Sequence, residues 1–200
     1  GAAYAKANGG NFQITAKVVD KDVQLTVTGV SAHSSEPESG VNPVARMLDF
    51  INSLDGKIAL KHNAFTDGAR YAADNWGLDY LGNKLGIGFA DAFMGPLTTS
   101  PTFVGVDDKA FKLAVNLRVP KGKTPDVLKA EITDKLAAWS KKTQVAVTLI
   151  SSSRLTGLQV ARTVLSERSA LPIRRRRRTS SRAACRPSPR GTSMSTTPMR

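Results

Sequence analysis

The sequence predicts an α+β domain in which helices cover one face of an antiparallel sheet, a two-layer sandwich. Two pairs of strand-like segments joined by short polar turns predict antiparallel hairpins at residues 12–29 and 102–119. A helix is expected after each hairpin, at Asn42-Pro43 and Thr124-Pro125, because an N-cap residue precedes a proline. A closing strand over 145–150 completes the order strand-strand-helix, insertion, strand-strand-helix-strand.

The first half begins with a short helix over residues 2–8, which Gly9-Gly10 ends. Residues 12–19 and 23–29 flank the turn Asp20-Lys21, and the second segment alternates apolar and polar residues as a half-buried strand does. Residues 31–40 are too polar for a regular element. The helix that follows has four apolar residues on one face: Val44, Met47, Leu48 and Ile51.

The second half begins with a helical pattern over residues 65–84, which Gly77 and Gly82 interrupt. Residues 86–100 are rich in Gly, Pro, Thr and Ser and predict a long ordered loop. Strands over 102–106 and 111–119 follow. The inner side of the last helix is apolar: Val127, Leu128, Ile132, Leu136 and Trp139.

The net charge of +13 suggests a nucleic-acid-binding protein, but its distribution assigns the charge to one segment. Residues 1–150 hold 17 basic and 15 acidic side chains, whereas residues 151–200 hold 12 arginines and one acid. We therefore predict a domain over 1–150 and a disordered, Arg/Ser/Pro-rich tail over 151–200. The run Arg174 to Arg178 would bind nucleic acid weakly and without sequence preference; a solvated charge run is the alternative.

Two features bear on the compartment. Cys185, the one cysteine, has no internal partner, which favours a reducing compartment and the cytoplasm. No apolar run has the roughly 18 residues that span a bilayer, so no membrane partner is expected. The chain starts at Gly1 rather than Met, so we interpret the sequence as part of a longer protein. If that longer protein has a leader peptide, we expect a periplasmic or secreted protein rather than a cytoplasmic one.

The polar loop is the densest candidate site, because it joins a strand to the first turn of a helix. It brings the imidazole of His33, several hydroxyls and free backbone N–H groups to one sheet edge. His33 could donate a hydrogen bond to a developing oxyanion. On residue types alone, a surface histidine in a polar loop is the more common outcome.

Three motifs in order resemble the lid domain of zinc peptidases that use two metal ions, in particular the PepV-type dipeptidases. Residues 26–43 resemble the Ser/Ala-His-x-Ser motif of the lid, residues 85–101 its Met-Gly-x-Leu loop, and Asn116-Leu117-Arg118-Val119-Pro120-Lys121-Gly122 its Asn-Leu-Arg motif. The resemblance covers roughly residues 12–150 and implies a ferredoxin-like lid.

The resemblance also implies roles for single residues. His33 would polarise the scissile carbonyl, and Arg118 would bind the free carboxylate of a dipeptide, for which a guanidinium fork is suited. Met94, Gly95 and Ser100 would shape the substrate cavity. The alternatives stay open at this stage: a strand-end ion pair for Arg118, and simple loop architecture for the other three.

The partners implied are a zinc-binding catalytic domain absent from this chain, the dipeptide substrate and a second copy of the lid. Two-zinc hydrolysis needs about five His and carboxylate ligands, whereas His33 and His62 are the only histidines. We expect no metal site and no cofactor in this chain, and no peptidase activity from it alone; His62 is expected to be an exposed loop residue.

The tail departs from the family, which continues into a helix and a glycine-rich segment. One permitted codon choice for residues 179–190, shifted by one base, encodes a string that resembles the family's catalytic C-terminal segment. An out-of-frame tail is therefore a hypothesis that the nucleotide sequence would test.

Overall fold

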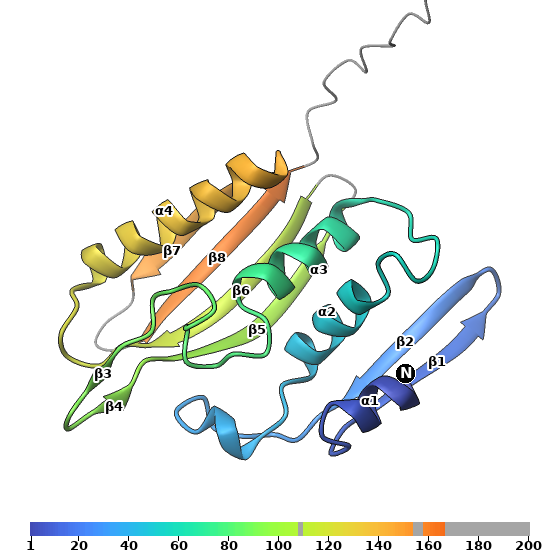
Figure 1. Ribbon diagram of the computed structural model, residues 1–200, viewed down its shortest axis with the longest axis horizontal. Helices are drawn as coiled ribbons and strands as arrows, with labels where there is room; N and C mark the ends of the chain where they lie inside the picture. Colours follow the sequence, from blue (N-terminus) through green and yellow to red (C-terminus); the bar gives the residue numbers. More distant parts are fainter. Residues whose placement is uncertain (108–109, 154–157, 167–200) are drawn as a thin grey trace, which may run out of the picture. The chain divides into compact units, whose positions relative to one another are not determined.

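The main sheet has four antiparallel strands in the order β5-β6-β8-β7 (Figure 1). These are β5 (Thr98–Val106), β6 (Ala110–Arg118), β7 (Ala146–Ser153) and β8 (Leu158–Ser166). The computed structural model describes residues 1–107, 110–153 and 158–166, and beyond residue 150 only the course of the backbone. Alternate residues of β6 form the centre of the core, each at most 1% exposed: Phe111, Leu113, Val115 and Leu117.

Helices α3 (Ala64–Asn75) and α4 (Pro125–Thr143) lie on one face of this sheet (Figure 1). The rings of Tyr71 and Trp139 join the two helices edge to face, with centroids 5.2 Å apart. The inner residues of α4 are buried as predicted, apart from Val127, which is 48% exposed. This arrangement confirms the predicted α+β fold with helices on one side of an antiparallel sheet.

Helix starts follow the local sequence signals. Helix α2 (Pro43–Ser53) is capped by Asn42, whose side chain accepts hydrogen bonds from the N–H groups of Val44 and Ala45. Thr124 caps α4 in the same way. Helix α3 begins at a capping box formed by Asn63 and Thr66. It ends at Asn75, short of the predicted residue 84.

Glycines explain the early end of α3. Gly77 and Gly82 have φ of 58° and 71°, a left-handed conformation that does not continue a helix.

The predicted first hairpin is present, but it is a two-stranded sheet of its own. Its strands are β1 (Gln13–Val19) and β2 (Asp22–Thr28), preceded by α1 (Ala2–Ala7). The succession β2-α2-β5-β6-α4-β7 is the βαββαβ order of a ferredoxin-like domain, with α3 inserted. In the sheet, β8 rather than β2 lies between β6 and β7 and pairs with both.

The segment expected to be a loop over 86–100 contains short strands. β3 (Ala90–Asp91) and β4 (Gly95–Pro96) pair with each other, and β5 begins at Thr98, four residues before the predicted start. The Asp91 carboxylate accepts from the backbone N–H groups of Phe93 and Met94 at 3.0 and 2.7 Å, which fixes the turn between β3 and β4.

Part of the segment 151–200, which is predicted to be a tail, is among the described residues. Residues 151–153 complete β7, and residues 158–166 form β8. Composition describes the average of a segment, whereas β8 exchanges backbone hydrogen bonds with a neighbour on each side. Residues 154–157 and 167–200, with Cys185 and Arg174 to Arg178, lie outside the described residues. Within the described part of the chain, no helix is both long and apolar enough to cross a bilayer.

Candidate functional site

The loop that carries His33 leaves the end of β2 and closes on itself before α2. Val30 and Val41 exchange backbone N–H···O bonds of 3.1 and 2.9 Å at its neck. A Cβ on Gly40 would lie 2.5 Å from the Ala32 Cβ, and one on Gly29 would lie 2.1 Å from the Val41 carbonyl oxygen. The two glycines therefore permit the close approach that shapes residues 31–40, which include the 3-10 turn η1 (Pro37–Ser39).

Ser34 fastens this loop to the sheet. Its carbonyl oxygen accepts from Thr98 Oγ1 at 3.2 Å, and its hydroxyl accepts from Arg118 Nε at 3.1 Å. Thr98 and Arg118 are directly opposite each other in the β5–β6 register, so their side chains share one face. The structure thus brings Arg118 next to the residue that follows His33, although 84 positions separate Ser34 from Arg118.

Asn42 attaches the loop to β5 at a second place, Ser100 and Pro101. Its amide Nδ2 donates to Ser100 Oγ at 3.2 Å and to the Pro101 carbonyl at 2.7 Å, while its Oδ1 caps α2. Ser100 therefore lies beside the loop that bears His33.

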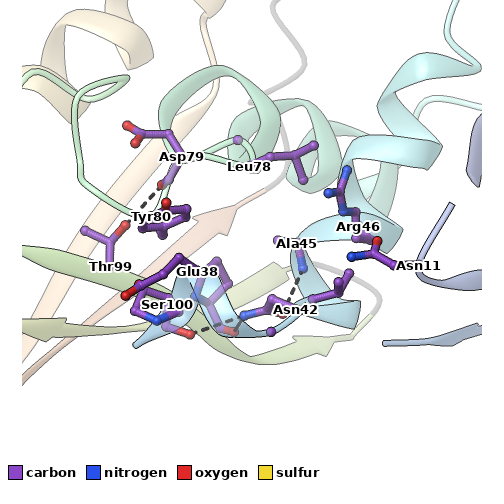
Figure 2. Close-up of a pocket in the computed structure, with 15 residues that line it drawn as sticks. Asn11, Glu38, Asn42, Ala45, Arg46, Leu78, Asp79, Tyr80, Thr99 and Ser100 are labelled. Carbon is purple, nitrogen blue, oxygen red and sulfur yellow. Dashed lines mark hydrogen bonds between the residues drawn. The ribbon is translucent and has the colours of Figure 1, made fainter. Parts of the chain in front are cut away.

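A hollow of about 330 Å³ opens between the loop and β5. Six polar residues contribute to its lining: Ser31, His33, Ser34, Asn42, Ser100 and Thr102. A neighbouring hollow of about 280 Å³ shares Asn42 and Ser100 (Figure 2). At one end of this second hollow lie Asn11 and Arg46, whose guanidinium is 4.7 Å from the centre of the Phe12 ring. Asp79, Tyr80 and Thr99 lie at the other end.

The surroundings of His33 indicate which ring nitrogen carries the proton. Nδ1 lies 2.6 Å from Ser35 Oγ, and the Ser35 backbone N–H donates to Nδ1 over 3.4 Å. A backbone N–H can only donate, so Nδ1 acts as the acceptor. In the neutral ring the proton is then on Nε2, and the exposed imidazole can offer that N–H to a ligand.

Arg118 does not form the strand-end ion pair that was the alternative to a ligand-binding role. Among the described residues, no carboxylate is within ion-pair distance of its guanidinium, and Ser34 is its one hydrogen-bond partner. The side chain is half-buried. A partly desolvated cation that keeps free N–H groups is suited to binding an anion from outside the domain.

Met94 and Gly95 lie in the β3–β4 hairpin, Met94 in its turn and Gly95 at the start of β4. Neither lines the two hollows. Met94 is 53% exposed, and Gly95 has φ of 79° with open space for 4 Å around the point that a Cβ would occupy. Of the five predicted site residues, the structure therefore groups His33, Ser100 and Arg118 around the polar loop and leaves these two at a hairpin tip.

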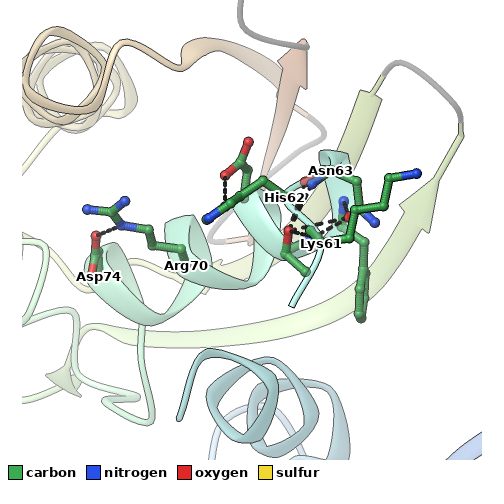
Figure 3. A network of polar contacts seen from close by, with 8 residues as sticks. Lys61, His62, Asn63, Arg70 and Asp74 are labelled. Atoms are coloured by element: carbon green, nitrogen blue, oxygen red, sulfur yellow. Dashed lines mark hydrogen bonds and ion pairs between the residues drawn. The ribbon is translucent and has the colours of Figure 1, made fainter. Parts of the chain in front are cut away.

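His62 is an exposed loop residue, as predicted. Its side chain is 74% exposed, and Nδ1 lies 3.9 Å from the Asp67 carboxylate beside the start of α3 (Figure 3). The polar contacts around it cap a helix and include the Asn63–Thr66 box. In the part of the chain that the structure describes, no three His, Cys, Asp or Glu side chains are grouped so that they could hold a metal ion.

Three polar residues of this site were not singled out from the sequence. Ser34 and Thr98 hold Arg118 and the loop together, and Asn116 has a buried Oδ1 without a hydrogen-bond partner among the described residues. The pairing register of β5 and β6 is what relates these residues to the site, because it places Thr98 opposite Arg118 and Ser100 opposite Asn116.

Comparison with known proteins identifies the family of the matched segment. The family model of the M20 peptidase dimerisation domain matches residues 21–144, more than half of the chain. The "Beta-Ala-Xaa dipeptidase" of Lactobacillus delbrueckii is 28% identical over 129 residues, which are 64% of this chain and 26% of that protein. A "Putative dipeptidase" of Staphylococcus saprophyticus is 33% identical over 108 residues, 52% of this chain and 22% of that protein.

The matches thus span about a quarter of the length of these relatives. Within that span lie the His33 loop and the strand that ends at Arg118. The chain belongs to the peptidase dimerisation domain family of the M20 peptidases.

Proposed function

We propose that this domain is the substrate-capping lid of a zinc dipeptidase. In this proposal Arg118 binds the C-terminal carboxylate of a dipeptide, and His33 polarises the scissile carbonyl. Ser100 contributes to the wall of the cavity, and Met94 and Gly95 reach it from their hairpin in the assembled enzyme. The name of the Lactobacillus relative suggests dipeptides that begin with β-alanine as the substrate class.

One observation carries the proposal: Arg118 is half-buried, its guanidinium has no acidic partner among the described residues, and it is bonded to the loop of His33. Partly buried charges are normally paired, because desolvation is costly without compensation. A substrate carboxylate would supply that pairing. The Nε2 proton of His33 is the matching donor for a carbonyl oxygen that gains negative charge.

Zinc chemistry would come from the catalytic domain that the family adds to its lid. The described residues of this chain offer no set of ligands that fits the metal. We expect the purified chain to hydrolyse no dipeptide, with or without added Zn²⁺. Chelator-sensitive hydrolysis by the purified chain would show that ligands lie in residues outside those described.

Nuclear magnetic resonance titration of the ¹⁵N-labelled chain tests the binding role. The ligands are β-alanyl-alanine and its C-terminal amide, which differ only in the C-terminal group, a charged carboxylate or a neutral carboxamide. We expect the acid to shift the resonances of residues 31–36, Thr98 and Arg118, and to bind about 10-fold more tightly than the amide. A charge-assisted hydrogen bond contributes about 1.5–3 kcal/mol, which corresponds to at least that ratio.

The variant Arg118→Gln should remove the preference for the acid and leave the amide affinity unchanged. Arg46→Gln is the matched control, because Arg46 lines the neighbouring hollow and stacks on Phe12. Equal affinity of the wild-type chain for acid and amide, or loss of the preference in Arg46→Gln alone, would contradict the proposed role of Arg118.

Self-association is a second candidate function, favoured by apolar residues on the β1–β2 hairpin. Val18 and Val23 face each other across the hairpin and are 72% and 63% exposed. We propose that a second copy of the chain covers them. Light scattering at micromolar concentration should give a dimer mass that falls to a monomer in Val23→Lys, while Ile58→Lys, at another exposed position, leaves it unchanged. A monomeric wild-type chain would exclude this function.

Two expectations stay predictions. The predicted nucleic-acid binding is assigned to Arg174 to Arg178, which lie outside the described residues. Deletion of residues 167–200 should abolish that binding. The cytoplasm remains the predicted compartment.

A further inference from the structure

We infer that Ser34 is a positioning residue that fixes which edge of the Arg118 guanidinium meets the substrate carboxylate. The inference rests on the proposed function, because it concerns how that same site recognises its ligand. It concerns a side chain that contacts neither the carboxylate nor the scissile bond, and that acts through Arg118.

Three segments of the chain meet at Ser34. The loop supplies Ser34 itself, β5 supplies the buried Thr98, and β6 supplies Arg118. Thr98 holds the Ser34 backbone through the carbonyl oxygen, so the hydroxyl of Ser34 is presented to Arg118 from a fixed support. The bond from Arg118 Nε to Ser34 Oγ is 3.1 Å long.

A guanidinium group offers a carboxylate two different forks. One consists of the two terminal nitrogens, and the other consists of Nε and one terminal nitrogen. The Ser34 hydroxyl accepts from the Nε–H and therefore occupies the second fork. Among the described residues the two terminal nitrogens have no partner, so this fork binds the carboxylate end-on.

The neutral character of Ser34 is essential to this arrangement. A hydroxyl orients the guanidinium without cancelling its charge, whereas a carboxylate at the same place would form an ion pair and compete with the ligand. Because His33 immediately precedes Ser34, the same contact relates the carboxylate-binding fork to the imidazole. Ser34 thereby contributes to selection of ligands whose carbonyl and carboxylate have the spacing of a dipeptide.

Variants of Ser34 test the inference in the titration with β-alanyl-alanine and its amide. Ser34→Ala should weaken binding of the acid by about threefold to 10-fold, the range typical of the net effect of losing one hydrogen bond, and leave the amide unaffected. Ser34→Thr retains the hydroxyl and should restore the acid affinity to within about twofold of the wild type. Ser34→Asp should abolish the preference for the acid. Ser39→Ala, in the same loop with its hydroxyl bonded to the Glu36 carbonyl, should behave like the wild type.

A ligand-free measurement separates failure of this inference from failure of the proposed function. The Arg118 Nε–H resonance should exchange with water more slowly in the wild type and in Ser34→Thr than in Ser34→Ala. Unchanged exchange in Ser34→Ala would overturn the inference, even if the wild type prefers the acid. If the Arg118 Nε–H exchanges slowly in the wild type but the chain binds acid and amide equally, the Ser34–Arg118 contact is present and the proposed dipeptide function is rejected.

A double-mutant cycle completes the test. In the Arg118→Gln background, Ser34→Ala should have no further effect on binding of the acid, because Ser34 acts only through Arg118. An effect of Ser34→Ala that persists in this background would assign it a role independent of the guanidinium and overturn the inference.

Discussion

Gly68 of α3 lies against Phe111 of the main sheet, and its replacement by alanine tests the packing of the two layers. A Cβ at position 68 would lie 2.1 Å from Phe111 Cγ and 2.2 Å from Phe111 Cδ2. Carbon atoms in contact are normally about 3.5–4.0 Å apart, so the ring or the helix would have to move by more than about 1 Å. Phe111 is 0% exposed, which leaves the ring little room to move.

Two opposing terms set the magnitude. Alanine in place of a helical glycine stabilises by about 1 kcal/mol through helix propensity. Overpacking of a closed core costs about 1–3 kcal/mol, and a contact this short belongs at or above the upper end. We therefore expect Gly68→Ala to lower the free energy of unfolding by about 2 kcal/mol.

Urea denaturation followed by far-ultraviolet circular dichroism measures this change as a lower midpoint at constant slope. Ala138→Gly, at an exposed position of α4, calibrates the propensity term and should cost about 1 kcal/mol. Phe111→Ala should cancel the overpacking cost of Gly68→Ala in a double-mutant cycle, because it removes Phe111 Cγ and Cδ2, the atoms nearest the added Cβ. A Gly68→Ala chain more stable than the wild type would show that α3 does not pack on Phe111, and the reasoning would fail.

Three further perturbations follow from single contacts. Burial, and then the hydrogen bond to Asp49, raises the pKa of Tyr4, so its stabilisation is complete below about pH 10 and is lost as the pH rises further. Denaturation midpoints across that range should fall less steeply in Tyr4→Phe than in the wild type, and equal slopes would contradict this. Asn63→Ala removes the cap that accepts from the N–H groups of Phe65 and Thr66, and we expect a loss of about 1 kcal/mol by urea denaturation; no loss would mean that the box is not formed. Gly40→Ala should separate Val30 from Val41 and abolish the nuclear Overhauser contacts between them, since its Cβ would lie 2.8 Å from the Val30 carbonyl oxygen; retained contacts would refute the close approach.

Features that depend on a few neighbouring residues were predictable from the sequence. The starts of α2 and α4 follow from Asn42-Pro43 and Thr124-Pro125, because a cap bonds to N–H groups two or three residues away. The first hairpin follows from alternation around Asp20-Lys21. The motifs around His33 and Arg118 were sufficient to indicate the family that the comparison later established.

Strand neighbours and the contacts of the site were decided by the tertiary structure. Pairing of β8 between β6 and β7, and the separate β1–β2 sheet, depend on which backbone edges meet, and local propensity does not encode this. The link from Arg118 to the His33 loop through Ser34 joins residues 84 positions apart. The sequence by itself determined the helix starts, the first hairpin and the family motifs, because motifs and caps act over short distances. Only the tertiary structure decided that, within the described part of the chain, Arg118 has Ser34 rather than an acid as its partner, because that depends on strand register and loop closure.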